Sequence, residues 1–164
     1  MIYSNKFTYS QKKALKTLRD NFFWSEDQLD YLIACMMFES NCNPQAINKI
    51  SKAIGLIQFM PATCKYLNVD YEMLKNASFE TQLIYVQEYF KPYYKRTRTL
   101  NDMYMAILMP KFIGYSDDTN IFSKEIQYRQ NIGLDLNKDG IITKAEACNK
   151  VRKLYEKGKM NVWV

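Results

Sequence analysis

Hydrophobic residues recur at three- and four-residue intervals along much of this chain, which is the spacing of amphipathic helices. The clearest stretch opens with a capping box, Ser25-Glu26-Asp27-Gln28, and continues with an apolar face made of Leu29, Leu32, Ile33, Met36 and Met37. Because the residue before a proline disfavours helical backbone, this helix should end between Asn41 and Pro44. The pattern therefore predicts a long helix with one face in the core.

Other stretches have helical spacing or a helix-start signal. We expect helices over residues 10–20, 61–67, 78–96 and 101–109, the third strained near Pro92, and one helix on each side of residues 135–146. Residues 44–61 and 112–119 contain glycine and little periodicity and should be loops. With no internal repeat or linker, the chain should form a single domain of residues 1–164, with residues 122–158 as a helix-loop-helix within it or appended to it.

The composition supports a mainly helical fold and narrows the chemistry. Of 164 residues, 48% are hydrophobic, enough for a core without disulfide staples, while 5 Gly and 4 Pro leave few of the tight turns that an all-β sandwich needs. The chain contains no histidine. This excludes Ser-His-Asp and Cys-His catalysis and every histidine-ligated metal site, so any chemistry must use carboxylate, tyrosine, lysine or cysteine side chains.

The charge balance is basic but dispersed. Lys and Arg number 23 against 17 Asp and Glu, and the net charge of +6 favours association with polyanions such as nucleic acid, teichoic acid or an acidic cell wall. The basic residues stand in short groups such as Lys12-Lys13 and Lys95-Arg96-Thr97-Arg98, which is more typical of solvated helix faces than of a nucleic-acid interface. We therefore expect no nucleic-acid partner.

The chain shows neither a signal peptide nor a membrane span. Residues 1–9 lack a continuous apolar segment, and no stretch approaches the roughly 20 apolar residues of a spanning helix. We expect synthesis in the cytoplasm, no membrane insertion, and a separate route of export if the protein acts outside the cell. The four cysteines form no C-x-x-C pair and should be reduced and structural, although the sequence leaves a Cys42–Cys64 disulfide open as the alternative.

Glu39 is the first candidate for chemistry. It lies three residues after Met36 and seven after Leu32, at the edge of the apolar face and just before the helix breaks. Burial beside apolar side chains disfavours an ionised carboxylate and raises its pKa, so the group can stay protonated near neutral pH, as a general acid must. The alternative interpretation is a glutamate that turns into water at a helix end.

The residues that follow Glu39 decide between these interpretations. Glu39-Ser40-Asn41 and Asn43-Pro44-Gln45-Ala46 precede Ser51-x-Ala53-x-Gly55-Leu56-Ile57-Gln58-Phe59-Met60-Pro61-Ala62-Thr63. This order is similar to the signature of the soluble lytic transglycosylase and goose-type lysozyme superfamily, E-S-x-x-N-P-x-A followed by G-L-x-Q-x-M-P-x-T. The resemblance covers about 25 residues and implies a lysozyme-like helical domain in which the two segments form the floor of a glycan cleft.

The resemblance also implies roles for individual residues. Glu39 is the implied catalytic acid and base, and Ser40 and Met60 are implied to face the cleft. Gly55 lets main chain approach a sugar closely, and the Gln58 amide can donate to and accept from an N-acetyl group. Ser40 has the alternative role of satisfying the end of its own helix, and the Gly55–Gln58 segment that of a plain turn.

No second carboxylate stands out beside Glu39. Five others are more typical of solvated helix residues: Asp70, Glu72, Glu80, Glu88 and Asp102. A single glutamate is enough in the enzymes that the chain resembles, because in lytic transglycosylases the muramyl 6-hydroxyl or the N-acetyl group of the substrate supplies the nucleophile and a 1,6-anhydro product forms. The reaction begins when a carboxylic acid within about 3 Å protonates the glycosidic oxygen.

One segment of the family pattern is missing. Members usually carry A-Y-N-A-G after the long helix, with its tyrosine near the catalytic glutamate, whereas this chain has Tyr104-Met105-Ala106-Ile107-Leu108-Met109-Pro110 in that region. Tyr104 or Tyr115 can take the place of the missing tyrosine, although neither occupies the same motif position. The stretch from Leu100 to Pro110 resembles phage-encoded members of the superfamily.

Residues 135–146 match the twelve-residue EF-hand loop, which binds calcium through oxygen atoms. Glycine stands at the sharp turn, and the ligand positions are held by Asp135, Asn137, Asp139, the Ile141 carbonyl, Thr143 and Glu146. The alternative is an Asp-Gly turn before a helix capped by Thr143 and Glu146. Calcium sensors normally pair their EF-hands, so a single loop favours one structural Ca²⁺ and no metal in catalysis.

Together these features predict a muramidase that cleaves the β-1,4 bond between N-acetylmuramic acid (MurNAc) and N-acetylglucosamine (GlcNAc) in peptidoglycan glycan strands, as a lytic transglycosylase or a lysozyme. The lack of a signal peptide, the mild positive charge and the small size agree with a phage lysin or virion component made in an infected bacterium, with other virion proteins as further partners. Two alternatives stay open: a chitin- or chitosan-cleaving relative, and a calcium-dependent binding or assembly protein with an inactive lysozyme-like cleft.

Overall fold

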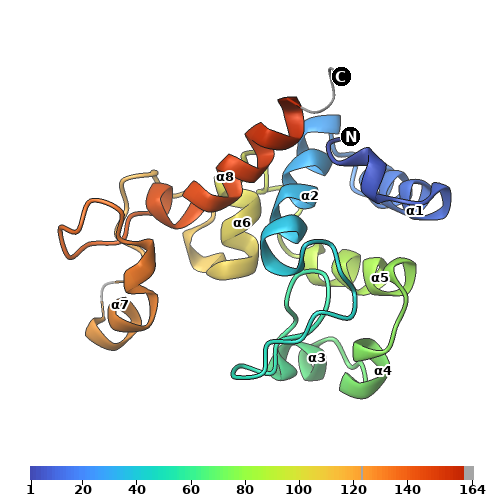
Figure 1. Ribbon diagram of the computed structural model, residues 1–164, viewed down its shortest axis with the longest axis horizontal. Coiled ribbons are helices and arrows are strands. Elements are labelled where there is room, and N and C mark those ends of the chain that lie inside the picture. The colour runs from blue at the N-terminus through green and yellow to red at the C-terminus, as the bar shows by residue number, and fades with distance from the viewer. Residues whose placement is uncertain (123, 161–164) are drawn as a thin grey trace.

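The computed structural model describes residues 1–122 and 124–160, and most of them lie in helices (Figure 1). In chain order the elements, with η for a 3-10 helix, are η1 (Ser4–Lys6), α1 (Tyr9–Asn21), α2 (Glu26–Ser40), α3 (Pro61–Tyr66), α4 (Tyr71–Lys75), α5 (Phe79–Phe90), α6 (Leu100–Leu108), η2 (Pro110–Phe112), α7 (Glu125–Asn131), η3 (Ile132–Leu134) and α8 (Lys144–Met160). Isolated β-bridges join Ile47 to Ile54, Ile54 to Phe59, and Asn120 to Thr143. The predicted mainly helical class is confirmed.

The helix α2 begins and ends as its sequence predicts. The Ser25 side chain accepts a hydrogen bond from the Gln28 main chain, and the Gln28 side chain accepts one from the Ser25 main chain, which completes the capping box. At the other end, Asn41 and Cys42 adopt left-handed backbone with φ of 55° and 58°. Their N–H groups bond back to carbonyl groups in the last turn, as at many helix C-termini, so the chain turns away directly after Glu39 and Ser40.

One helix prediction was wrong, and one short helix was missed. The helix expected over residues 78–96 ends at Phe90, and residues 91–96 form turns. Pro92 has no N–H group to continue the helix, and its ring clashes with the preceding turn. The short helix α4 was not predicted, because five residues are too few to show a helical period.

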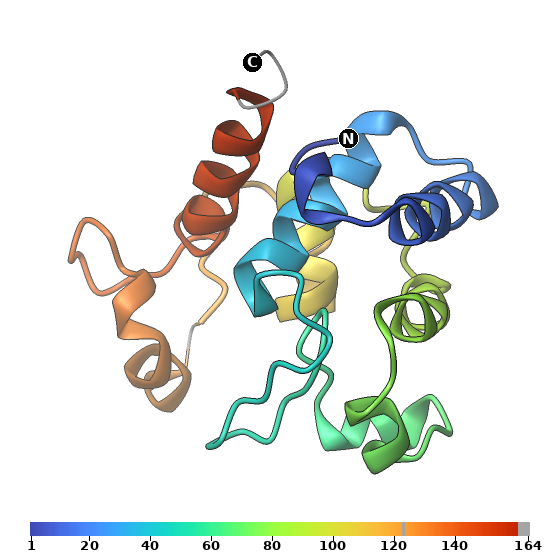
Figure 2. The same cartoon turned by 45° about the vertical axis from the view of Figure 1, so that its right-hand side comes forward.

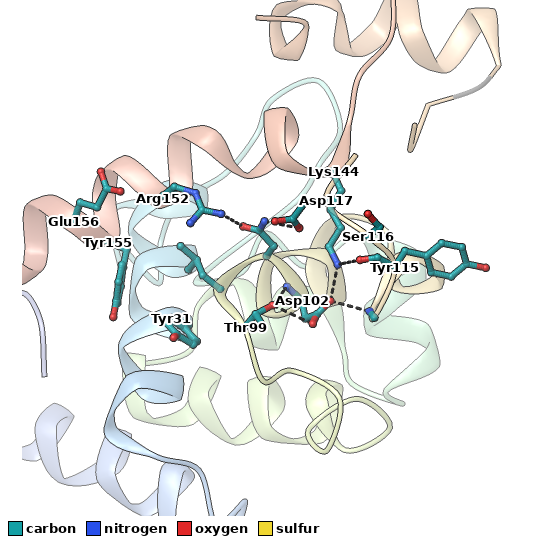
Figure 3. Close-up of a pocket in the computed structure, with 13 residues that line it drawn as sticks. Tyr31, Thr99, Asp102, Tyr115, Ser116, Asp117, Lys144, Arg152, Tyr155 and Glu156 are labelled. Atoms are coloured by element: carbon teal, nitrogen blue, oxygen red, sulfur yellow. Dashed lines mark hydrogen bonds and ion pairs between the residues drawn. The ribbon is translucent and has the colours of Figure 1, made fainter. Parts of the chain in front are cut away.

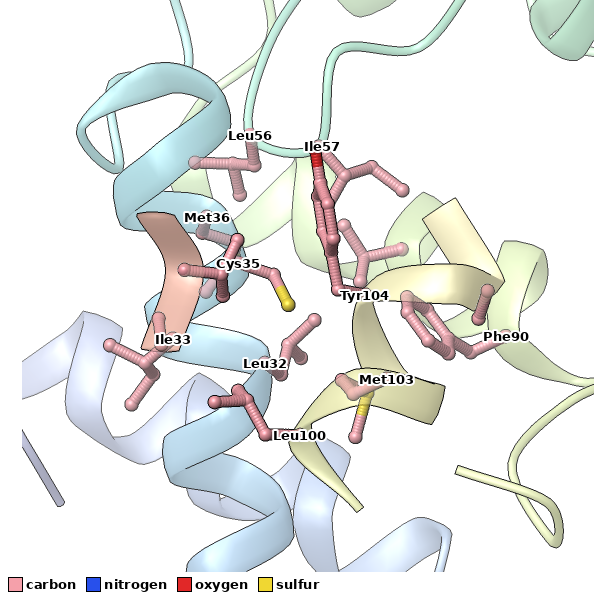
Figure 4. Close-up of a cluster of buried hydrophobic side chains, with 14 of the residues drawn as sticks. Leu32, Ile33, Cys35, Met36, Leu56, Ile57, Phe90, Leu100, Met103 and Tyr104 are labelled. Atoms are coloured by element: carbon pink, nitrogen blue, oxygen red, sulfur yellow. The ribbon is translucent and has the colours of Figure 1, made fainter. Parts of the chain in front are cut away.

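The core forms around α2, which packs against α6 and α8, while α1 packs against α5 (Figures 1 and 2). The close-up shows apolar side chains of α2 meeting those of α6 and of the loop after α2, among them Leu32, Cys35, Met36, Leu56, Ile57, Leu100, Met103 and Tyr104 (Figure 4). Full burial of a large apolar side chain contributes about 1.5–3 kcal/mol. This packing fixes the last turn of α2 against both α6 and the loop.

Both ends of the described chain are tied to α2 through one buried aspartate. Asp30 is 2% exposed, and its two oxygens accept from the Ile2 main chain at 2.8 Å and from the Lys159 ammonium at 3.0 Å. By contrast, the segment with α7 and η3 extends away from α1 and α5 and returns to the body of the molecule at the start of α8 (Figure 2).

All four cysteines are free, as predicted, and no Cys42–Cys64 disulfide forms. Cys35, Cys64 and Cys148 are buried as small apolar side chains. None of the helices in residues 1–122 and 124–160 is both long enough and apolar enough to cross a membrane.

Candidate active site

Glu39 lies in the last turn of α2, where its side chain is half-buried. Burial raises the pKa of Glu39 to about 7, and a hydrogen bond from the Tyr104 side chain lowers it only in part. A carboxyl group with this pKa is about half protonated at pH 7 and can both give and take a proton. The structure thus places a group with the acidity of a general acid at the position singled out in the sequence.

Tyr104 reaches Glu39 from α6. Its side chain is 3% exposed and packs edge-on against Phe38, with ring centroids 5.6 Å apart. Burial, followed by the charge of Glu39, raises the pKa of Tyr104 far above its ordinary value, so the phenol keeps its proton and acts as a donor. Tyr115, the other tyrosine considered from the sequence, is 55% exposed and packs against Phe112 instead.

The Gly55–Gln58 segment is a tight turn closed by two main-chain hydrogen bonds. The Ile54 N–H donates to the Phe59 carbonyl at 3.0 Å, and the Phe59 N–H donates to the Ile54 carbonyl at 2.8 Å. Gly55 has a φ of 72°, a conformation that glycine adopts at little cost. Gln58 also has a left-handed backbone, with φ 54°, and such strain in a non-glycine residue often marks a functional loop.

The Ser40 hydroxyl joins this turn to the helix that carries Glu39. It lies within hydrogen-bond distance of two carbonyl oxygens, 3.1 Å from that of Met36 in its own helix and 2.9 Å from that of Leu56 in the turn. The interpretation that the Ser40 hydroxyl satisfies the end of its own helix is confirmed, and the same hydroxyl also connects the helix to the turn. Its hydroxyl serves as a link between backbone segments.

Gln58 and Met60 follow on the same loop. The Gln58 Nε2 atom donates to the Gly55 carbonyl at 3.1 Å, which holds the half-buried amide over the turn. Met60 is 44% exposed and occupies the N-cap position of α3, before Pro61. Both side chains keep part of their surface available to a ligand.

The sequence analysis did not identify Gln82, which holds the Gly55–Gln58 turn against α5. This residue of α5 is fully buried, and its Oε1 atom accepts from the Leu56 N–H at 2.9 Å. Its Nε2 atom donates to the Pro44 and Leu74 carbonyls at 2.7 and 2.9 Å. The available signal was a polar residue on the apolar face of a predicted helix, one turn before Val86.

A cavity of about 540 Å³ lies between α2, α6 and α8, and Glu39 does not line it (Figure 3). Its floor contains Asp102, which the sequence analysis took for a solvated helix residue. That interpretation was wrong, because Asp102 is 8% exposed and its carboxylate binds the Lys144 ammonium at 2.6 Å and the Gly114 N–H at 2.7 Å. Burial raises the pKa of Asp102, but bonds from Lys144, Gly114 and Thr99 outweigh it and leave the pKa below its ordinary value, so this carboxylate cannot serve as an acid near neutral pH.

The proposed calcium loop leads into the start of α8, on the projecting segment that also carries α7 and η3 (Figure 1). The Asp135 carboxylate accepts from the main chain of Lys138 at 2.7 Å and of Gly140 at 3.0 Å, and from the Tyr128 hydroxyl at 2.7 Å. The Glu146 carboxylate accepts from the Thr143 N–H at 2.9 Å. Within the described residues, no three or more Cys, Asp and Glu side chains are grouped closely enough to hold a metal ion.

The arrangement around Glu39 suits acid–base chemistry. It combines a carboxyl of raised pKa, a buried phenol donor from α6, and a turn held by Ser40 and Gln82. The contacts of α2 with α6 and with the Gly55–Gln58 turn therefore both stabilise the core and position the residues around Glu39.

Comparison with known proteins produced one finding. The family model described as "Transglycosylase SLT domain" matches residues 25–108, just over half of the chain, and this range contains Glu39, the Gly55–Gln58 turn and Tyr104. No curated protein and no solved structure matches the chain.

Proposed function

Because the chain belongs to the transglycosylase SLT domain family, whose members cleave glycosidic bonds of peptidoglycan, we propose that it cuts the MurNAc-GlcNAc β-1,4 bond with Glu39 as the catalytic residue. The observation that carries this proposal is the pKa of about 7 at Glu39. A carboxyl of ordinary pKa would be ionised at neutral pH and could not protonate the glycosidic oxygen. The same group, once ionised, can accept a proton in the second half of the reaction.

The other site residues would prepare Glu39 and the sugar. Tyr104, whose side chain lowers the pKa of Glu39, would donate to the carboxylate that forms when the proton leaves and so stabilise it. Ser40 and Gly55 set the distance between α2 and the turn, and Gln58 and Met60 offer an amide and a thioether to the substrate. In a lytic transglycosylase the muramyl 6-hydroxyl or N-acetyl group then displaces the leaving sugar, and in a lysozyme water does.

Mass spectrometry of purified peptidoglycan after digestion tests the proposal. We expect muropeptides with 1,6-anhydro ends from the wild-type protein and none from Glu39→Gln, whose amide keeps the shape of the side chain but is no acid. Glu72→Gln is the matched control, because Glu72 is 64% exposed and pairs only with Lys75 among the described residues. More than a tenth of wild-type activity in folded Glu39→Gln would remove Glu39 from the catalytic role.

The products also separate the alternatives. Muropeptides with reducing ends would identify a lysozyme, and cleavage of chitin or chitosan without cleavage of peptidoglycan would identify a relative with another substrate. No product from any of these glycans would leave a binding or assembly protein with an inactive cleft. As for context, we propose a phage lysin or virion component, which the resemblance of residues 100–110 to phage-encoded members supports.

We also propose that residues 135–146 bind one structural Ca²⁺. The donor types fit this ion, since Asp135, Asn137, Asp139, Thr143, Glu146 and the Ile141 carbonyl all offer oxygen. The main-chain bonds that Asp135 accepts already curl the loop around its first ligand position. The ion would add stability only, because proton transfer by Glu39 needs no metal.

Calorimetry and thermal unfolding test the calcium site. At a calcium concentration of 100 times Kd, the ion should stabilise the protein by about 2.7 kcal/mol and raise Tm by about 5–10 °C. Asp135→Ala with Asp139→Ala should make Tm independent of calcium, whereas Asp118→Ala, an exposed position outside the loop, should not. Absence of heat at millimolar calcium, or loss of activity on chelation in protein that is still folded, would contradict the structural role.

A further inference from the structure

A groove of about 330 Å³ lies next to the Glu39 site, between α3 and the end of α5. Three of its five lining side chains are tyrosines, and the other two are small: Ala62, Thr63, Tyr66, Tyr89 and Tyr93. No lining side chain carries a charge. The volume is within the range of sites for small ligands.

The tyrosines differ in how firmly they are held. Tyr89 is half-buried, and its hydroxyl donates to the Ala106 carbonyl at 2.7 Å. Its ring packs at 5.8 Å from that of Tyr93 and at 6.4 Å from that of Phe59. Tyr66, in contrast, is 77% exposed. The groove therefore has a rigid inner wall and an exposed aromatic ring at its edge.

The inner wall is continuous with the Glu39 site. The Tyr89 hydroxyl donates to the carbonyl of Ala106, which lies two residues after Tyr104 in α6. Burial, the charge of Tyr93 and the charge of Glu39 all raise the pKa of Tyr89, so its phenol lies within electrostatic range of the Glu39 carboxyl. The other wall, α3, begins at Pro61, directly after the loop that contains Gln58 and Met60.

We propose that Tyr66, Tyr89 and Tyr93 form a subsite that holds one GlcNAc ring of the glycan strand on which Glu39 acts. A pyranose ring has apolar C–H faces and hydroxyl edges, and tyrosine offers an aromatic face with a hydroxyl at its tip. In the glycan strand, O3 of MurNAc carries the lactyl group and its stem peptide, whereas O3 of GlcNAc is a free hydroxyl, so a groove of about 330 Å³ favours the smaller sugar. This inference rests on the proposed function for its substrate class.

Binding to the non-cleaving protein tests the subsite without cleavage. With Glu39→Gln as the background, calorimetry measures Kd for a β-1,4-linked GlcNAc tetramer. Adding Tyr66→Ala should weaken binding roughly tenfold, the upper range for an aromatic contact. Tyr66→Phe keeps the ring and should change Kd less than threefold, and so should Tyr9→Ala, a control at a tyrosine that is 84% exposed and outside the groove.

Kinetics on peptidoglycan supply a second measurement. In the wild-type background, Tyr66→Ala should raise KM with little change in kcat, because the ring would bind ground state and transition state alike. An unchanged Kd and KM in Tyr66→Ala, or no binding of the tetramer at millimolar concentration, would overturn the subsite even if the wild-type protein cleaves peptidoglycan. If the wild-type protein cleaves nothing but the Tyr66 series changes Kd as expected, the subsite stands and the proposed catalysis fails.

Discussion

Replacing Glu39 with glutamine should stabilise the protein, and the gain should grow with pH. Burial holds the pKa of the folded-state carboxyl at about 7 instead of 4.5. Well below pH 4.5 both the folded and the unfolded chain keep the proton, so the group has no effect on stability. As pH rises from 4.5 to 7, the unfolded chain loses the proton first and folding stability falls, and above pH 7 the loss is complete.

The size of the effect follows from the two pKa values. At 1.36 kcal/mol for each pH unit, the difference between 4.5 and about 7 corresponds to about 3 kcal/mol once Glu39 is fully ionised. An uncharged amide carries no such penalty. Glu39→Gln should therefore gain about 1 kcal/mol over the wild type at pH 5 and about 3 kcal/mol at pH 8, and each kcal/mol raises Tm by about 2–4 °C in a domain of this size.

Urea unfolding followed by circular dichroism at pH 5 and pH 8 measures both values. Any effect of the amide that does not depend on charge cancels when the two pH values are compared. Glu72→Gln, at a solvated position, should have the same effect at both. An equal gain in the free energy of unfolding for Glu39→Gln at pH 5 and pH 8 would mean that the Glu39 carboxyl is not desolvated. The argument that burial raises its pKa would then be wrong.

Three further variants test Tyr104, Gly55 and the Asp102–Lys144 ion pair. Tyr104→Phe removes the hydroxyl that lowers the pKa of Glu39. Because a hydrogen bond to a charged group is worth about 1.5 kcal/mol, the alkaline limb of the pH–activity profile should move from near pH 7 to about pH 8. An alkaline limb that does not move would refute the contact between Tyr104 and Glu39. Gly55→Ala should lower the free energy of unfolding by about 3 kcal/mol, measured in urea, because φ is 72° and the new methyl group would overlap the Gln82 amide. Lys144→Met should cost about 3–5 kcal/mol by leaving Asp102 buried and unpaired, and adding Asp102→Asn should recover most of that loss in a double-mutant cycle.

The amino-acid sequence by itself determined most helix starts and ends, because these depend on bonds between residues a few positions apart. The capping box at Ser25 and the end of the helix just before Asn41 both appear in the structure where the local pattern predicts them. The position of Glu39 at the edge of an apolar face also follows from helical periodicity alone. Where a local signal was given too little weight, as at Pro92, the predicted helix was too long.

Only the tertiary structure decided which polar side chains are buried and what they contact. The sequence pattern allows solvent exposure of Asp102, yet packing against α8 buries it, and only the folded chain shows that Gln82 holds the Gly55–Gln58 turn. The approach of Tyr104 to Glu39 likewise joins residues of α2 and α6 that are far apart in the chain. The physical reason is that burial and its effect on pKa depend on every element that surrounds a side chain, whereas capping and periodicity depend on the nearest turn alone.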